Sequence, residues 1–242
     1  MKIKTKTMDN TMNNTNESKR LFNLSMKYVI PFFAYLSVPW LADKLFSNEF
    51  ISYTGKVIAT GLLLLYFLKQ YKELKISFTK VTFFQSLLTG FVVFLFWVLP
   101  EVVFDKLPSW YYMGELNVFN PYIAYNGNLV LAVSFIVVRL IGAVIIAPVV
   151  EELFVRSFLM RLLIDNDFEK VKIGTYTLLS FIVTVVFFGF NHVRWIQGLL
   201  SAIIFNIYLY YKKDIFAVIQ AHAWTNWFLA VFVLTTSSYA FW

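Results

Sequence analysis

Long apolar stretches separated by short polar ones run from about residue 28 to residue 242. Stretches of about 20 apolar residues cross a bilayer as helices, because a helix satisfies its backbone hydrogen bonds within one segment. The period-2 alternation of a membrane β-barrel is missing from the sequence. The pattern therefore predicts an all-α, polytopic transmembrane helix bundle of about seven spans. The expected spans are 28–46, 50–68, 81–104, 129–150 running on to about 163, 174–192, 196–211 and 215–238.

The spacing of these stretches divides the chain into three parts. Residues 1–24 form a polar tail rich in Asn, Thr and Lys, which we expect to be disordered and which lacks the apolar core of a signal peptide. Residues 25–128 hold the first three spans and one long loop, 105–127. The Trp and Tyr content of this loop suits a connector at the outer membrane interface, and a lid is the alternative. Residues 129–242 hold the last four helices.

Composition and charge support a membrane protein and indicate how it is oriented. The chain is 59% hydrophobic, 20% aromatic and 14% charged, which excludes an ordinary soluble domain. Lys and Arg fall 15 to 4 in favour of the amino-terminal side of the spans, which predicts a cytoplasmic amino terminus. The four on the opposite, outer side are Lys44, Lys56, Lys106 and Arg194. We expect a multi-pass protein of the bacterial inner membrane. The net charge of +7 then reflects topology and attraction to anionic lipids, and no nucleic-acid partner is expected.

Ionisable side chains within the predicted spans are the candidates for function. On insertion scales each costs at least ~2.5–3.5 kcal/mol at the centre of the membrane, so it needs a reason to be there. The sequence has no cysteine, which excludes disulfides, thiolate catalysis and Cys-ligated metal. The polar residues at depth are Arg139, Glu151, Glu152, Arg156, His192 and His222, with neutral Asn191, Asn206, Gln220 and Asn226. Arg139 could pair with a carboxylate across the bundle or mark the lipid interface.

Helical geometry separates the two adjacent glutamates. Glu152 and Arg156 are four residues apart and share a face, which predicts an intrahelical ion pair. Glu151 is rotated by about 100° and is expected to face a polar cavity as a base. Pro148 removes a backbone donor and can kink the helix just before the acidic pair. The alternative is that both glutamates are structural.

The two histidines of the chain each have a neighbour at helical spacing. His192 follows Phe188 by one turn, and Asn226 follows His222 by one turn. A carboxylate, two imidazoles and an amide can together activate water and stabilise an oxyanion, although each histidine alone could be an interfacial residue. This hypothesis requires Glu151 and these polar groups to meet at one cavity. The expected helix ends oppose that, because at about 1.5 Å per residue they place His192 roughly 10 Å farther from the cytoplasmic side than Glu151.

Three motifs in this order resemble the CPBP family of intramembrane proteases, named for CAAX processing and bacteriocin processing and also called Abi. The motifs are EExxxR at 151–156, FxxxH at 188–192 and HxxxN at 222–226. The resemblance covers residues 139–242 and is strongest to the CAAX-protease-related proteins that accompany exosortase systems. It implies an endopeptidase in which Glu151 and His192 activate water and His222 and Asn226 stabilise the oxyanion. Glu152 and Arg156 would support these catalytic residues.

The resemblance also bears on metals and partners. The family has been described as metalloproteases, and Glu151, His192 and His222 could ligate zinc. Neither HExxH nor its reverse occurs, so we expect no cofactor and leave zinc open. The implied partners are the lipid bilayer and a protein or peptide substrate delivered by the membrane. A non-catalytic membrane scaffold or chaperone with the same fold is the rival; a transporter is disfavoured because no repeated half is visible.

Overall fold

The computed structural model of the chain describes residues 2–104, 107–116 and 118–242, with side chains from residue 19 onward. Within these ranges every regular element is a helix. The helices are α1 (Lys2–Phe46), α2 (Glu49–Phe67), η1 (Leu68–Gln70), α3 (Lys80–Val103), η2 (Ser109–Tyr111), α4 (Pro121–Ala124), α5 (Leu129–Leu140), η3 (Ile141–Ile146), α6 (Ala147–Glu152), η4 (Leu153–Leu159), α7 (Met160–Leu162), η5 (Phe168–Lys170), α8 (Leu178–Phe190), α9 (Trp195–Lys212), α10 (Ile215–Thr236) and η6 (Tyr239–Phe241).

The membrane-spanning character predicted from the sequence is confirmed. Five helical stretches are long and apolar enough to cross a bilayer: Lys19–Phe46, Glu49–Gln70, Lys80–Val103, Leu129–Leu162 and Ile215–Thr236. The remaining two predicted spans are helices α8 and α9. Helix α8 has 13 residues, and about 20 Å of helix is shorter than the roughly 30 Å hydrocarbon core. Helix α9 buries the polar Gln197, Ser201 and Asn206.

The predicted tail, residues 1–24, lies mostly outside the part whose side chains are described. Residues 19–24 are helical, and Leu24 packs against the hydrophobic core. The first membrane helix therefore begins before the expected residue 28, because Leu24 already has apolar partners. The disorder of residues 1–18 stays a prediction.

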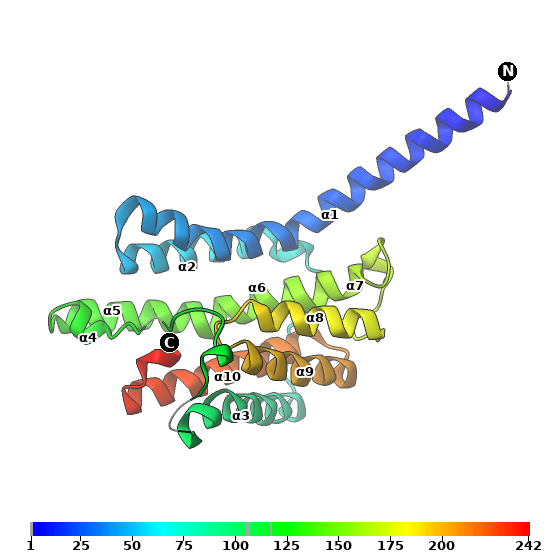
Figure 1. Ribbon diagram of the computed structural model, residues 1–242. Coiled ribbons are helices and arrows are strands. Elements are labelled where there is room, and N and C mark those ends of the chain that lie inside the picture. Colours follow the sequence, from blue (N-terminus) through cyan, green and yellow to red (C-terminus); the bar gives the residue numbers. More distant parts are fainter. Residues whose placement is uncertain (1, 105–106, 117) are drawn as a thin grey trace.

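The helices pack in three layers around one long central helix (Figure 1). Helices α1 and α2 form an antiparallel pair on one side. The central helix runs from α5 through α7 as a continuous stretch, Leu129–Leu162, with α8 beside its second half. Helices α9, α10 and α3 cover the opposite side. Helix α10 therefore contacts the central helix on one face and α3 on the other.

Side-chain caps and one close crossing set the positions of these helices. Asn48, Thr79, Asn128, Thr177 and Asp214 each cap the amino end of a helix by accepting a backbone N–H. Helices α3 and α10 approach closely at Gly90, where a Cβ would lie 2.5 Å from the carbonyl oxygen of Ala221. Only glycine fits there, and the crossing fixes the depth of α10.

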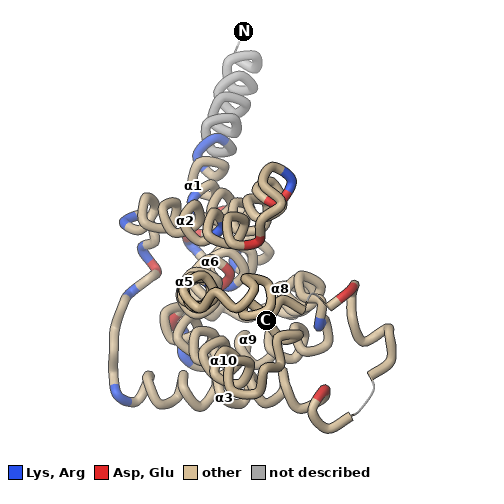
Figure 2. Tube along the Cα trace, turned by 90° about the vertical axis from the view of Figure 1, so that its left-hand side faces the viewer, with Lys and Arg blue, Asp and Glu red and all other residues tan. Residues whose placement is uncertain are grey.

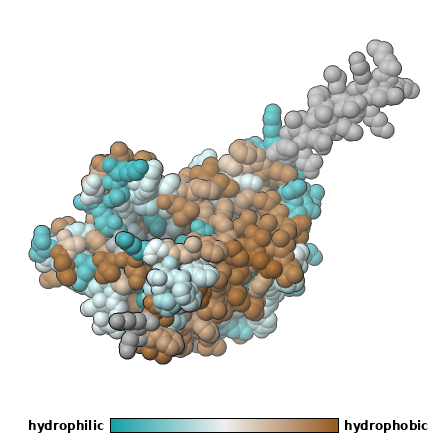
Figure 3. Space-filling model, in the orientation of Figure 1, coloured by the Kyte–Doolittle hydropathy of each residue, from teal (hydrophilic) through white to brown (hydrophobic). Residues whose placement is uncertain are grey.

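The distribution of charge agrees with a membrane-embedded bundle. Most Lys, Arg, Asp and Glu lie on connecting segments and helix ends, and few positions within the helices are charged (Figure 2). A broad hydrophobic area covers the middle of the face shown in Figure 3, with hydrophilic residues toward the ends. Large apolar side chains such as Leu65, Phe84 and Val130 are exposed on the bundle, as expected for contact with lipid.

The long loop between α3 and α5 rests on the turn between α8 and α9. The Met113 N–H donates to the Val193 carbonyl at 2.7 Å, and the indole N–H of Trp195 donates to the Trp110 carbonyl at 3.0 Å. Residues 105, 106 and 117 of this loop lie outside the described residues. These contacts suit an interfacial connector that braces the turn.

Candidate active site

The two glutamates lie in a short α-helical segment between two wider π-helical ones. Segments η3 and η4 carry hydrogen bonds that reach back five residues, as in Ala147 N–H to Gly142 O and Met160 N–H to Val155 O. Pro148 lies in the first turn of α6, directly after η3. The backbone irregularity expected at this proline thus takes the form of π-helix, which is frequent at functional sites.

Glu152 is the centre of a fully buried polar network. Its Oε1 accepts from Arg156 Nη1 at 3.0 Å and is 2.8 Å from Nδ1 of His222. Glu152 and Arg156 are both 0% exposed, so the predicted ion pair is confirmed in a dry environment. The contact with His222 was not predicted, because nothing in the sequence shows that α10 lies against α6.

The network continues from Arg156 into helices α9 and α8. Arg156 Nε donates to Asn206 Oδ1 at 3.1 Å, and Asn206 Nδ2 donates to Thr184 Oγ1 at 3.0 Å. The guanidinium also lies 4.3 Å from the ring centroid of Phe188. From the sequence, Asn206 was identified only as one of the neutral polar residues at depth. In the structure Asn206 helps to hold Arg156 in place.

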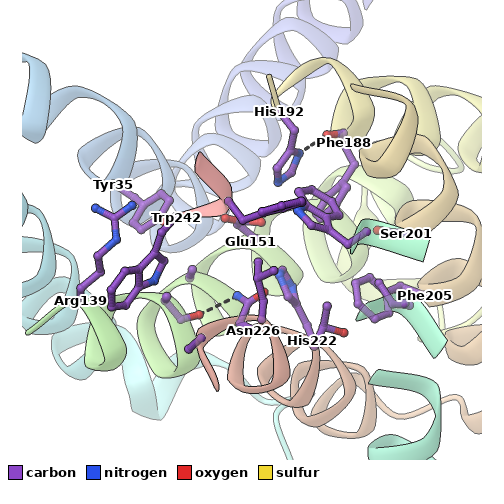
Figure 4. A pocket seen from close by; sticks show the side chains of 18 of the residues that line it. Tyr35, Arg139, Glu151, Phe188, His192, Ser201, Phe205, His222, Asn226 and Trp242 are labelled. Atoms are coloured by element: carbon purple, nitrogen blue, oxygen red, sulfur yellow. Dashed lines mark hydrogen bonds between the residues drawn. The ribbon is translucent and has the colours of Figure 1, made fainter. Parts of the chain in front are cut away.

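Glu151 points away from this network into a cavity of about 320 Å³ (Figure 4). His192, His222 and Asn226 line the same cavity. Figure 4 shows Glu151 between His192 on one side and the pair His222 and Asn226 on the other. The four predicted residues therefore converge, as the hydrolytic hypothesis requires.

His192 lies in the turn after α8, where two helices cross closely. Its Nδ1 is 2.7 Å from the Phe188 carbonyl oxygen, and since a carbonyl only accepts, Nδ1 carries the proton. At the crossing, a Cβ on Gly198 would lie 3.0 Å from the Gly189 Cα and 3.4 Å from Nδ1 of His192. The two glycines let α8 and α9 approach, and this close approach positions the imidazole.

His222 and Asn226 are held from the other side of the cavity. The His222 ring stacks on Phe205 with centroids 5.2 Å apart, while its Nδ1 faces Glu152. Asn226 Nδ2 donates to the Ala143 carbonyl of η3 at 2.7 Å, which joins α10 to the central helix. One of the two amide protons of Asn226 is thus used for structure, and the second stays available to a ligand.

The expected mismatch in depth between Glu151 and His192 is resolved by a corrected helix boundary. Helix α8 begins at Leu178, four residues later than the predicted 174, because residues 174–177 form the preceding turn and the Thr177 cap. His192 then lies about 21 Å along from the start of α8, and Glu151 about 17 Å from the end of α7 at Leu162, counting roughly 1.5 Å per residue.

Two cations lie in the cavity wall, of which Lys56 was missed in the sequence and Arg139 was left without a role. Lys56 of α2 lines the cavity, although the predicted spans placed it on the outer side. Arg139, left unassigned, lies at one end of the cavity beside Tyr35 and Trp242 in Figure 4. The signal for Lys56 was present, since this lysine interrupts an apolar stretch just as the other candidates do.

A second hollow of about 230 Å³ reaches the same glutamate from between α1 and α8. Phe32 and Leu36 form its α1 wall, and Phe187 and Asn191 form its α8 wall. Glu151 lines both hollows, as do His192 and Lys56. The carboxylate can therefore be reached from two directions.

The arrangement gives no ready cage for a metal ion. Among the described residues no group of three or more His, Cys, Asp or Glu side chains could hold one. Nδ1 of each histidine is occupied, by Phe188 O or by Glu152, which leaves Nε2 of each ring for a ligand. Glu151, His192 and His222 are therefore not gathered into a three-ligand set among the described residues, and no chemical step is derived through a metal.

The helices and the cavity define an integral membrane protein of a polytopic, all-α class with a polar site at depth. Residues 132–228 match the family model for Type II CAAX prenyl endopeptidase Rce1-like proteins, and the matched range contains all three motifs. The match confirms the resemblance to the CAAX-type intramembrane proteases. The search of the curated proteins and the search of the solved structures found no match. The exosortase-associated subgroup stays a prediction.

Proposed function

We propose that this chain is an intramembrane endopeptidase in which Glu151 and His192 activate water. The supporting observation is the convergence of Glu151, His192, His222 and Asn226 on one cavity, where Glu151 is the only Asp or Glu side chain among the described lining residues. A carboxylate that lines a cavity without a hydrogen-bond partner among the described residues is available to a ligand. Such a group in a spanning helix needs a functional reason.

The first step is the attack of water on a peptide carbonyl. Glu151 accepts one proton as the water oxygen bonds to the carbonyl carbon, and the carbonyl π electrons move to its oxygen. In the neutral His192 ring, Nδ1–H donates to Phe188 O, which leaves the Nε2 lone pair free to orient the water.

The oxyanion formed in this step needs donors on the far side of the carbonyl. The free amide proton of Asn226 can donate to it, and so can Nε2–H of His222 when that ring is doubly protonated. Glu152 supports this form, because its carboxylate lies 2.8 Å from Nδ1 and stabilises positive charge on the ring. Collapse of the intermediate breaks the C–N bond, and the proton held by Glu151 passes to the leaving amine.

Glu152 and Arg156 act as positioning residues in this mechanism. They do not line the cavity, and Glu152 holds His222 while Arg156 balances the charge of Glu152. Because the shared carboxylate is fully buried and bonded to Arg156, it holds the imidazole in one orientation.

The substrate is a protein or peptide that reaches Glu151 from the bilayer. The α1 wall of the hollow between α1 and α8, formed by Phe32 and Leu36, is apolar and suits a lipid-embedded segment. The family description names prenyl substrates, but we propose that a prenyl group is not required in a bacterial inner membrane. The cytoplasmic amino terminus follows from the charge bias and is part of this proposal.

Replacing Glu151 with Gln tests the proposal. The isosteric change removes the base, so processing should fall by about 10²–10⁴-fold, the usual contribution of a general base, while substrate still binds. The readout is quantitative comparison of membrane proteins in the two strains, followed by cleavage of the accumulated protein by purified chain in vesicles. Metal content is measured on the same samples before and after chelation.

Glu115→Gln, in the loop between η2 and α4, is the matched control and should process normally. Unchanged processing in Glu151→Gln would contradict the enzyme and favour the scaffold. Stoichiometric zinc whose removal abolishes cleavage would contradict the metal-free chemistry alone.

A further inference from the structure

Two cations line the cavity and have no described role in the proposed chemistry. The charged side chains lining the cavity are two cations, Lys56 and Arg139, and one carboxylate, Glu151. Glu152 does not contribute, because Arg156 already neutralises it. Glu49 and Glu151 act on these cations through their charge, but neither carboxylate forms an ion pair with them within 4.0 Å among the described residues, so both cations can still take an anionic ligand.

Aromatic rings hold both cations and leave their N–H groups free. Lys56 Nζ lies 3.7 Å from the ring centroid of Tyr35, and the Arg139 guanidinium carbon lies 5.2 Å from the rings of Tyr53 and Trp242. A ring face stabilises a cation without accepting its N–H hydrogen bonds. Neither cation has a side-chain hydrogen bond or an ion pair within 4.0 Å among the described residues.

We propose that Arg139 and Lys56 form a subsite for a carboxylate of the peptide substrate, with Tyr53 and Trp242 as its walls. A guanidinium matches the two oxygens of a carboxylate in a bidentate pair, and Lys56 adds a point charge. The proposal rests on the peptidase function above, because the same cavity holds the bond-cleaving group. It also gives Arg139 the role that the sequence left open.

The geometry limits how far this carboxylate lies from the cleaved bond. Arg139 and Glu151 lie twelve residues apart on one helix, about 18 Å along its axis at roughly 1.5 Å per residue. An extended peptide rises about 3.3 Å per residue, so the carboxylate lies within roughly five residues of the cleaved bond. It belongs either to an Asp or Glu side chain or to the end of the substrate chain.

Binding of three related peptides tests the subsite without hydrolysis. Each is palmitoylated, carries a dansyl group and has one apolar sequence; the first ends in a carboxylate, the second in a carboxamide, and the third in a carboxamide with Asp four residues earlier. Binding to the full chain carrying Glu151→Gln is measured by anisotropy in zwitterionic micelles. At least one acidic peptide should bind tenfold or more tightly than the neutral one. The tighter of the two shows which source supplies the carboxylate.

Variants of the two cations assign the preference to the proposed residues. Arg139→Met should abolish it, Arg139→Lys should retain part of it, and Lys56→Met should reduce it severalfold. Lys44→Met is the matched control: Lys44 Nζ also lies over an aromatic ring, 3.9 Å from the centroid of Trp40, but Lys44 is exposed and does not line the cavity. The preference of Lys44→Met for the acidic peptides should equal that of the parent, which is the chain carrying Glu151→Gln alone. Thermal unfolding of each variant shows whether the bundle is intact, and Arg139→Lys keeps the test valid if Arg139→Met does not fold.

Three results would overturn the subsite. The first is equal binding of all three peptides. The second is that folded Arg139→Met prefers the acidic peptides over the neutral one as strongly as Lys44→Met does. The third is displacement of the acidic peptide by dioleoyl phosphatidylglycerol in the parent but not in Arg139→Met, which would assign the cations to a lipid headgroup. Since binding is measured without the catalytic carboxylate, failure of cleavage by the wild-type chain would defeat the peptidase proposal and not this measurement.

Discussion

The two faces of the central helix around Glu151 and Glu152 use the same kind of residue in opposite ways. On one face Glu152 is fully buried, with Arg156 and His222 as partners. On the other face Glu151 lines a cavity and has no hydrogen-bond partner among the described residues. Adjacent positions on a helix differ by about 100°, and that rotation is enough to separate a structural carboxylate from an available one.

The largest difference between the two faces should appear in stability. Glu152→Gln leaves Arg156 buried without a counter-charge, and breaking such a pair costs about 3–5 kcal/mol. Glu151→Gln should change the free energy of unfolding by less than about 1 kcal/mol, because no ion pair is broken. Unfolding of both variants in a titration with sodium dodecyl sulfate measures the difference.

A double variant sharpens this comparison. Glu152→Gln combined with Arg156→Met removes both charges, so it should be more stable than Glu152→Gln alone. Equal destabilisation by the two single glutamate variants would show that Glu152 is not the structural member of the pair.

A smaller effect is expected where the cavity face depends on a close helix crossing. In Gly198→Ala the new Cβ meets Gly189 and Nδ1 of His192, so α8 and α9 must separate. We expect a loss of about 1–3 kcal/mol from overpacking. We also expect a roughly tenfold fall in cleavage from the displaced imidazole. Both are measured on the purified chain.

Gly55→Ala in α2 is the control for this variant. Its Cβ would make only an ordinary contact at 3.7 Å with Val38, so cleavage should be unchanged. The free energy of unfolding should rise by about 0.5–1 kcal/mol, because alanine favours the helix. Normal cleavage by Gly198→Ala would show that His192 does not need this crossing.

The smallest effect should come from the far end of the buried network. Thr184→Val removes the acceptor of the Asn206 amide and should cost about 1 kcal/mol, the usual net value of one hydrogen bond. Thr235→Val is its counterpart on the exposed end of α10 and should change stability by less than about 0.5 kcal/mol. If the two variants unfold alike in detergent titrations, the network does not extend to Thr184.

The order and type of the helices follow from the sequence because the bilayer leaves few alternatives. Runs of apolar residues must be helical at depth, and cap residues such as Thr79 and Asn128 end the intervening segments. The predicted start of α8 was four residues too early. Residues 174–177 form a short segment, Gly-Thr-Tyr-Thr, that is only weakly polar, so hydropathy alone does not separate a turn from a helix there.

The candidate site was only partly predictable, and for a definite reason. Spacing along one helix gives the Glu152–Arg156 pair, and order along the chain gives the histidines. Contacts between helices, such as Glu152 with His222 and Arg156 with Asn206, depend on packing that one sequence does not show. Lys56 was assigned to a loop side by counting alternating spans, although its apolar surroundings indicated a buried cation.

The π-helical stretch Ile141–Ile146 lies just before the two glutamates. Hydrogen bonds that reach five residues back accommodate one residue more than an ordinary α-helix of similar length. Loss of a single residue from this stretch would let it close to an ordinary α-helix and leave positions 151 and 152 on nearly the same faces as now, whereas loss of a residue from the α-helical segment that follows would turn position 152 by about 100° to the angular place now held by position 151. The π-helical stretch is thus where this helix can change its length without exchanging the roles of its two acids.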